Sequence, residues 1–135
     1  MNVSNSSRRR FLGGLLATSL VPSPSWADAG SPTYLSAAAR PDGKFVLCGI
    51  AADLRIVFAQ PLPARGHAAA AHPSRPEAVA FARRPGTFAV VIDCTTGRQL
   101  AMLNAPAGRH FDGHGGFSGY GRHLFTTDND YAAGT

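Results

Sequence analysis

The chain has 135 residues, 44% of them hydrophobic and 16% charged, with 13 Lys and Arg residues against 8 Asp and Glu. Three of the basic residues stand together at Arg8–Arg10, and the others are scattered singly or in the pair Arg83-Arg84. Because no basic stripe with interleaved aromatic residues occurs, the sequence argues against binding to nucleic acid.

Residues 1–27 are predicted to be an export signal. A basic stretch precedes the apolar residues 11–21, and Ser25-Trp26-Ala27 supplies a small-x-Ala ending, so we expect cleavage after Ala27. The apolar stretch is shorter than the roughly 20 residues that a membrane span needs, so we expect no permanent membrane anchor. Removal of the signal would leave 10 basic residues against 8 acidic ones and lower the net charge from +5 to +2.

The basic part of the signal resembles the twin-arginine class, whose pattern is Ser/Thr-Arg-Arg-x-Phe-Leu-Lys. Arg8, Arg9, Phe11 and Leu12 match this pattern, and Gly13 departs from it. The resemblance implies export to the periplasm of a chain that is already folded, often with a cofactor inserted. A general secretory signal with an arginine cluster is the alternative, and it would lead to the same compartment.

Residues 28–135 are predicted to form an all-β domain. Short apolar runs alternate with Pro, Gly, Asp and Ser, and helical periodicity is almost absent. Ala68–Ala71 has helical propensity, but the flanking Gly66 and Pro73 leave no room for a helix. We expect strands over residues 34–38, 45–50, 55–59, 67–72, 78–82, 88–93, 99–103 and 123–127.

The predicted strands repeat. The turn at Pro41-Asp42-Gly43 corresponds to the turn at Gly121, 78 residues after Gly43, and residues 72–81 have a similar shape near the midpoint. Two periods of about 39 residues are typical of four-stranded propeller blades. The segment Asp93–Arg98 resembles the D-x-x-T-G-x turn between the third and fourth strands of many propellers. The sequence therefore predicts a partial β-propeller of about two and a half blades.

Residues 109–131 carry the most specific resemblance. They read RHFDGHGGFSGYGRHLFTTDNDY and are similar to GRHFYGHGxFSxDGxxLYTTENDY in a family of exported bacterial β-propeller proteins of unknown function, with YVTN/WD40-like blades. Gly119 and Tyr120 replace the usual Pro-Asp. The family closes a seven-bladed ring, so the resemblance implies that residues 28–135 are the N-terminal part of a truncated propeller. It also implies a link to periplasmic iron-uptake proteins.

A candidate metal site lies in the same stretch. In a regular strand His110, Asp112 and His114 would share one face, and Asp128 and Asp130 follow, so these side chains could hold a divalent ion. The nearby glycines indicate a bent or closely approached backbone instead. A structural hydrogen-bond network is the preferred interpretation, a ligand or metal site facing a central channel is the second, and catalysis is the least favoured.

Other reactive side chains give weaker signals. Ser118 lacks the flanking pattern of a nucleophile elbow, so no catalytic residue is assigned. His67 and His72 are predicted to be loop or capping histidines, and Cys48 and Cys94 to be buried core residues rather than a mutual disulfide.

Two functions remain open. The first is a periplasmic propeller that binds a protein partner or a small ligand without being an enzyme. The second is an oxidoreductase-like propeller that holds a metal or cofactor in its channel. Folded export mildly favours the second, whereas the absence of a recognisable cofactor motif favours the first.

Overall fold

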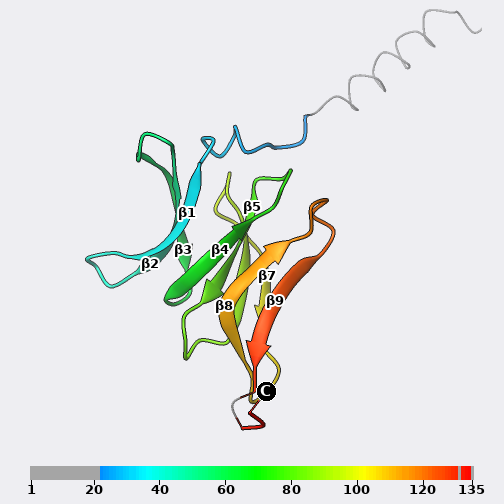
Figure 1. The fold of residues 1–135 in the computed structure, drawn as a ribbon. Coiled ribbons are helices and arrows are strands. Elements are labelled where there is room, and N and C mark those ends of the chain that lie inside the picture. Colours follow the sequence, from blue (N-terminus) through cyan, green and yellow to red (C-terminus); the bar gives the residue numbers. More distant parts are fainter. Residues whose placement is uncertain (1–21, 131, 135) are drawn as a thin grey trace, which may run out of the picture.

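The computed structural model of the protein describes residues 22–130 and 132–134. The signal residues Arg8, Arg9, Phe11 and Leu12 lie outside that part of the chain, whereas Ala27 lies within it. The described residues form nine strands in three antiparallel sheets and contain no helix, which confirms the all-β prediction (Figure 1). They accordingly include no helix with the length and apolarity that a membrane crossing needs.

Each sheet follows chain order, with every strand paired to the next. The first sheet contains β1 (Tyr34–Ala39), β2 (Phe45–Ile50) and β3 (Ile56–Leu62). The second contains β4 (Gly66–Ala71), β5 (Glu77–Ala82), β6 (Phe88–Asp93) and β7 (Gln99–Asn104). The third contains β8 (His110–Phe117) and β9 (Leu124–Asn129). The strands expected from the sequence are confirmed, and β8 is added to them.

Tight turns join the first two strands of the sheets. Gly43 between β1 and β2 has φ 78°, and Gly121 between β8 and β9 has φ 68°, a backbone conformation that glycine adopts without a steric penalty. Asp42 supports the first turn by accepting a hydrogen bond from the Lys44 backbone N–H at 3.1 Å. The predicted correspondence between these two turns is therefore confirmed.

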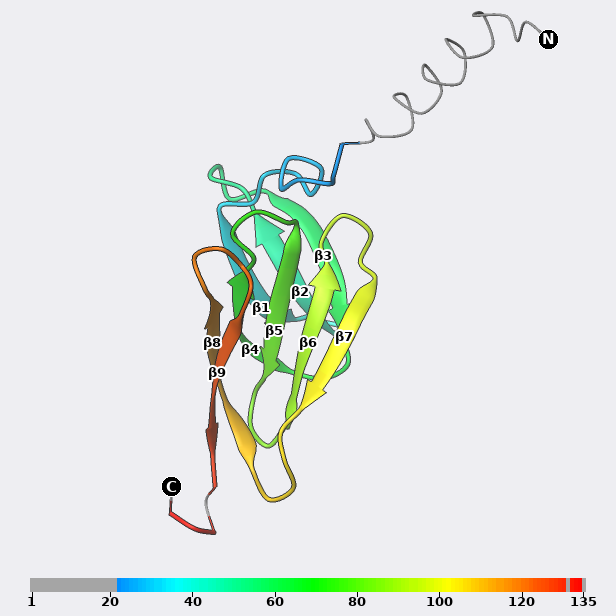
Figure 2. The same cartoon turned by 90° about the vertical axis from the view of Figure 1, so that its right-hand side faces the viewer.

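The three sheets fan out from their first strands. β4 contacts both β1 and β8, so the first strands of all three sheets lie next to one another (Figure 1). The later strands of the first two sheets extend away from this line, as Figure 2 shows for β5, β6 and β7. This arrangement is consistent with consecutive blades of a partial β-propeller.

The repeat is less regular than the sequence pattern indicates. β1, β4 and β8 begin at Tyr34, Gly66 and His110, so the two spacings are 32 and 44 residues rather than about 39 each. The first spacing is short because the first sheet has three strands, whereas the second has the full four. One short and one long spacing together place β8 76 residues after β1, close to the 78 residues that separate the matched turns.

β5 is buried on both faces and separates two hydrophobic clusters. Ala78 and Ala80 face the cluster shared with Leu47 and Leu62 of the first sheet. Val79 and Phe81 face the cluster that contains Phe111 of the third sheet. Small alanine side chains on one face let the first two sheets approach closely, whereas the larger residues on the other face fill the space beneath β8.

Both cysteines lie in the core as free thiols, which confirms their predicted placement. Cys48 is in β2, and Cys94 follows β6 with 1% of its surface exposed. Burial raises the pKa of the Cys94 thiol to about 12, and the neighbouring Asp93 carboxylate contributes in the same direction. A thiol held in its neutral form is a poor nucleophile and a poor metal ligand.

Candidate functional site

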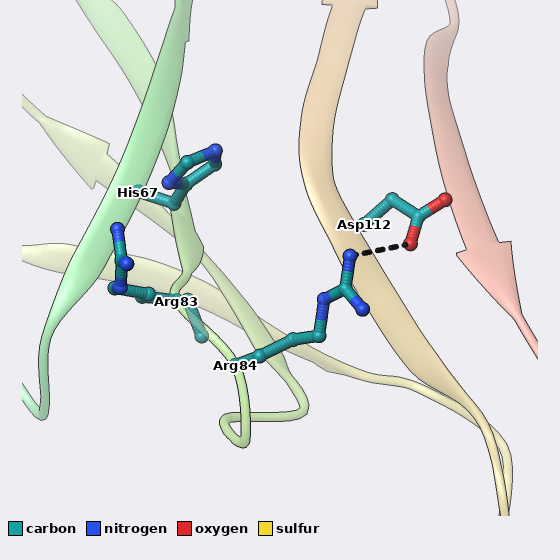
Figure 3. Close-up of a pocket in the computed structure, with 5 residues that line it drawn as sticks. His67, Arg83, Arg84 and Asp112 are labelled. Atoms are coloured by element: carbon teal, nitrogen blue, oxygen red, sulfur yellow. Dashed lines mark ion pairs between the residues drawn. The ribbon is translucent and has the colours of Figure 1, made fainter. Parts of the chain in front are cut away.

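A cationic cavity lies between the second and third sheets. It has a volume of about 300 Å³ and is lined by His67, Ala82, Arg83, Arg84 and Asp112 (Figure 3). His67 comes from β4, the two arginines follow β5, and Asp112 comes from β8. We call this cavity, with these lining residues, the inter-sheet cavity. It brings together side chains that are up to 45 residues apart in the sequence.

Irregularities in both flanking strands give the cavity its shape. The register of β4 shifts between Gly66 and Ala69, and that of β8 shifts between Phe111 and Gly115. Gly113 has φ 82°, and a Cβ atom there would lie 2.6 Å from the His67 ring, so only glycine fits without displacement. The β8 bulge is thus matched to the histidine that faces it from β4.

The two bulges bring a pair of histidines into contact. The rings of His67 and His114 meet edge to face, with centroids 4.9 Å apart and an interplanar angle of 84°. His114 Nδ1 also lies 3.2 Å from the Asp112 carbonyl oxygen, so the ring is folded back along its own strand. His67 therefore lines the inter-sheet cavity together with Asp112, and His114 contacts the His67 ring from β8.

Positive charge dominates the cavity. Arg84 Nη2 lies 3.8 Å from Asp112 Oδ1, a long ion pair whose side chains are 58% and 36% exposed (Figure 3). The backbone N–H of Arg83 donates to the Arg65 carbonyl at 2.8 Å, which fixes the turn that carries both guanidinium groups. Two guanidinium groups face one carboxylate, so the cavity keeps an excess positive charge.

The structure does not assemble the predicted metal site. Among the described residues no group of three or more His, Cys, Asp and Glu side chains is arranged to hold a metal ion. The premise that His110, Asp112 and His114 share the face of a regular strand is wrong, because the bulge at Gly113 interrupts the strand between Asp112 and His114. Binding of a metal by these residues has no geometric support here.

The two carboxylates that follow in the sequence are used elsewhere. Asp128 accepts two hydrogen bonds from Arg109, at 3.1 Å from Nε and 2.8 Å from Nη2. This pairing lowers the pKa of the Asp128 carboxyl. Asp130 accepts from the backbone N–H groups of Ala132 and Ala133 and closes a turn. Asp128 and Asp130 therefore take part in structural hydrogen bonds, as the preferred interpretation of this stretch predicts.

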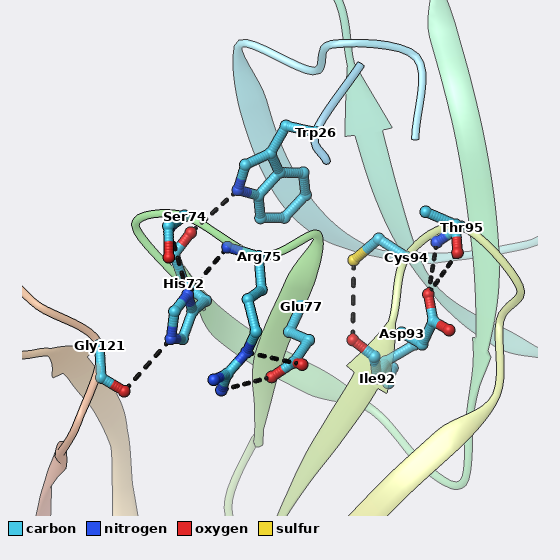
Figure 4. A network of polar contacts seen from close by, with 10 residues as sticks. All are labelled: Trp26, His72, Ser74, Arg75, Glu77, Ile92, Asp93, Cys94, Thr95 and Gly121. Carbon is cyan, nitrogen blue, oxygen red and sulfur yellow. Dashed lines mark hydrogen bonds and ion pairs between the residues drawn. The ribbon is translucent and has the colours of Figure 1, made fainter. Parts of the chain in front are cut away.

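His72 forms a second polar site, at the opposite end of β4 from the cavity (Figure 4). Its Nδ1 accepts hydrogen bonds from the backbone N–H groups of Ser74 and Arg75 at 3.2 and 3.0 Å. With Nδ1 as an acceptor, Nε2 carries the proton and donates to the Gly121 carbonyl at 3.2 Å. His72 is 2% exposed, so the predicted capping role is confirmed, and it extends across the gap to the third sheet.

The turn after β6 is held by a single carboxylate. Asp93 Oδ1 accepts hydrogen bonds from Thr95 N at 2.9 Å and Thr95 Oγ1 at 2.6 Å (Figure 4). Asp93 Oδ2 accepts a further bond from Thr96 Oγ1 at 2.8 Å. Gly97 completes the turn with φ 76°. These bonds, the Thr95 hydroxyl first, lower the pKa of the Asp93 carboxyl below its ordinary value of 3.8. The predicted D-x-x-T-G-x turn is confirmed.

Acid should weaken this turn. A depressed carboxyl pKa contributes stability that is present above the unfolded-state value of 3.8 and is lost as the pH falls through the lower folded-state value. We therefore expect Asp93→Asn to be less stable than the unchanged protein at pH 7, and the difference to shrink below pH 3.8. Urea denaturation of both proteins, at pH 7 and below pH 3.8, measures this difference in the free energy of unfolding. A difference that does not depend on pH would contradict the role of the ionised carboxylate.

Sequence reasoning identified one part of the inter-sheet cavity and missed another. The sequence points to Asp112 and His114, but as partners of His110, and it predicts a loop or capping role for His67 rather than a place in the cavity. The pair Arg83-Arg84 was visible only as a charge pair. Two arginines directly before Pro85-Gly86 place both guanidinium groups at a turn, and this was the signal that could have found them.

The chain matches one family model. The model is described as a protein of unknown function (DUF1513) and covers residues 60–135, more than half of the chain. The match includes every residue of the inter-sheet cavity as well as His72. No curated protein and no solved structure matches the chain.

Proposed function

The chain belongs to the family of proteins of unknown function DUF1513, and on this premise we propose that it is an exported β-propeller binding module that takes a small oxyanion. The ligand binds in the inter-sheet cavity between β4 and β8. One observation carries the proposal: the cavity of about 300 Å³ is lined by two guanidinium groups and a single carboxylate. The protein acts by binding and carries out no chemical step.

The chemistry of the lining favours an oxyanion over other ligands. Guanidinium groups present planar sets of N–H donors that match the oxygens of a carboxylate or a phosphate. Arg83 and Arg84 both line the cavity and can supply donors of this kind. The imidazole of His67 also lines the cavity and supplies a further ring N–H donor.

The dimensions of the cavity support a small ligand. A volume of about 300 Å³ is at the lower end of the range of ligand pockets, which is about 300–1,000 Å³. The cavity lies where two sheets meet, and the first strands β4 and β8 supply His67 and Asp112. Arg83 and Arg84 come from the turn after β5, which the Arg83 backbone bond to the Arg65 carbonyl holds in place.

Export rests on the sequence alone. Arg8, Arg9, Phe11 and Leu12 match the twin-arginine pattern, so we propose that the chain is delivered to the periplasm through that pathway. A small-ligand binding protein of this compartment meets its ligand free in solution. The propeller assignment, with YVTN/WD40-like blades, is supported by the fan of consecutive antiparallel sheets.

Isothermal titration calorimetry of the full chain with inorganic phosphate, and separately with citrate, tests the proposal. We expect binding of at least one of the two anions, and the comparison distinguishes phosphate from carboxylate recognition. Arg83→Ala should weaken the affinity about tenfold, which corresponds to about 1.4 kcal/mol, and added salt should weaken it in the unchanged protein.

Arg55→Ala is the matched control. Arg55 is also an arginine on a turn, with a side chain that is 72% exposed and paired with Asp53, but it belongs to the first sheet and does not line the cavity. Its removal takes away the same charge and should leave the affinity unchanged. Absence of binding for both anions, or equal losses in the two variants, would overturn the assignment of the inter-sheet cavity.

A further inference from the structure

The segment before β1 packs onto the first two sheets. Ser23 and Pro24 line a cavity of about 280 Å³ together with Arg75, Glu77 and Asp93 of the second sheet. Figure 2 shows the same segment crossing the end of the sheets where β1 begins. These residues precede the predicted cleavage position, so the part of the signal next to Ala27 contacts the folded domain.

Trp26 anchors the segment. Its indole Nε1 donates a hydrogen bond to the His72 carbonyl at 2.9 Å (Figure 4). The indole ring packs against the buried cluster that contains Leu47 and Ile92. Trp26 thus touches the core shared by the first two sheets and the residue that links the second sheet to the third.

A hydrogen-bonded turn surrounds the predicted cleavage position. The backbone N–H groups of Asp28, Gly30 and Ser31 donate to the carbonyls of Ser25, Ala27 and Trp26 at 3.0, 3.0 and 2.8 Å. The Asp28 carboxylate also accepts from the Ser25 backbone N–H at 2.7 Å and from its hydroxyl at 2.9 Å. These two bonds from Ser25 lower the pKa of the Asp28 carboxyl.

The turn is also held by packing. Ala29 is 5% exposed and belongs to the same buried cluster as Leu47. Gly30 has φ 83°, and a Cβ atom there would lie 2.8 Å from Val57 Cβ in β3. The backbone on the carboxyl side of Ala27 is therefore fixed against the first sheet by contacts that only glycine permits.

We propose that the folded chain resists cleavage after Ala27, and that Trp26 remains part of the mature fold. Proteases bind their substrates as extended strands and act on weakly held backbone. Ala27 and Asp28 are exposed, but hydrogen bonds hold the backbone around them in a closed turn. Hydrolysis between Ala27 and Asp28 would add one water across that peptide bond, and binding the bond in extended form would first require the turn to open and Trp26 to leave the core. A chain that folds before export presents this closed turn to the peptidase.

The proposal rests on the export part of the proposed function, and the two can fail separately. Appearance of the chain in the periplasmic fraction of its host tests export. The intact mass of the exported protein tests processing. We expect an amino terminus at or before Trp26, and a mature protein that begins at Asp28 would overturn the proposal.

A direct test incubates the full chain, in its folded state, with signal peptidase in detergent micelles. A synthetic peptide of residues 11–34 should be cut after Ala27, which shows that the sequence is a competent substrate. The folded chain should remain intact at that bond under the same conditions. Failure to cut the peptide, or equal cutting of peptide and folded chain, would show that the fold is not the protecting factor.

Variants identify Trp26 as the anchor. Trp26→Ala should be cut after Ala27 at least tenfold faster than the unchanged chain. Leu54→Ala removes another apolar side chain from the first-sheet side, but Leu54 is 75% exposed and should leave the rate unchanged. Because Trp26→Ala could unfold the whole domain, hydrogen exchange on the unchanged chain provides a second measurement. The amides of Asp28, Gly30 and Ser31 should be protected, and rapid exchange would contradict the closed turn.

Discussion

Replacement of Phe81 by alanine should lower the free energy of unfolding by about 3–5 kcal/mol, the usual range for removal of a fully buried phenylalanine. Phe81 in β5 has none of its surface exposed. Its ring meets that of Phe111 in β8 with centroids 6.4 Å apart and an interplanar angle of 71°. The substitution would empty the space between the second and third sheets.

The neighbourhood of Phe81 cannot collapse to fill this space. Gly115 in β8 lies so close that a Cβ atom there would collide with the Phe81 ring, and the backbone of β8 is paired with β9. The two sheets meet here through Phe81 and Phe111, so a cavity would weaken the contact between sheets as well as the local packing.

Urea denaturation followed by circular dichroism measures the effect. Phe125→Ala is the matched control, because Phe125 is also a phenylalanine of this sheet region but is 65% exposed. We expect it to change the stability by no more than about 0.5 kcal/mol. If the two variants lost equal stability, the contact between the second and third sheets would not be the one described here.

The second large effect is expected at His72. His72→Ala should lower the free energy of unfolding by about 2–4 kcal/mol, because it removes three hydrogen bonds together with the packing of a buried ring. The ring also packs edge to face on Phe117 of β8 at 5.0 Å between centroids. Its loss therefore loosens both the turn after β4 and the attachment of the third sheet.

A graded series separates these two roles. His72→Asn keeps a short side-chain acceptor for the N–H groups of Ser74 and Arg75 but cannot reach the Gly121 carbonyl. We expect about half of the loss seen for alanine. His123→Ala is the control, since His123 is exposed and its ring only tilts against Phe125. Thermal unfolding of all three variants measures these losses. If His72→Asn lost as much stability as His72→Ala, the separate roles of His72 in its own turn and in the link to the third sheet would be contradicted.

The same residue adds a second reason for a glycine that the turn already favours. Gly121 has φ 68°, which suits glycine, and a Cβ atom there would also collide with the His72 imidazole. The turn could be predicted from the residues around it, but this second requirement comes from a side chain 49 positions earlier. Contacts of this kind connect one sheet to the next and are invisible to local reasoning.

Much of the fold followed from local patterns. Alternating apolar runs bounded by Pro-Asp-Gly and Thr-Thr-Gly predicted the strands β1 to β7 and β9, because a turn and a half-buried strand are each specified by a few neighbouring residues. The absence of a helix over Ala68–Ala71 followed from its flanking Gly66 and Pro73. Cys48 and Cys94 were placed in the core for the same reason.

The candidate site depended on tertiary structure. His110, Asp112 and His114 have the spacing of a strand face, but the bulge at Gly113 breaks that face and brings His114 to His67 instead. Bulges arise where two strands must fit around each other's side chains, so they are decided by packing and not by the periodicity of one strand. Among the described residues these side chains therefore do not converge as a group that could hold a metal ion.

The sequence by itself determined that the chain is all-β, where its strands and turns lie, and that Asp93 and His72 support turns, because these depend on interactions between near neighbours. Only the tertiary structure decided that the first sheet has three strands, that Arg83 and Arg84 line one cavity with Asp112, and that Trp26 packs against the core. Each of these is a contact between distant segments, and its energy is set by the way the sheets pack rather than by the residues on either side of it.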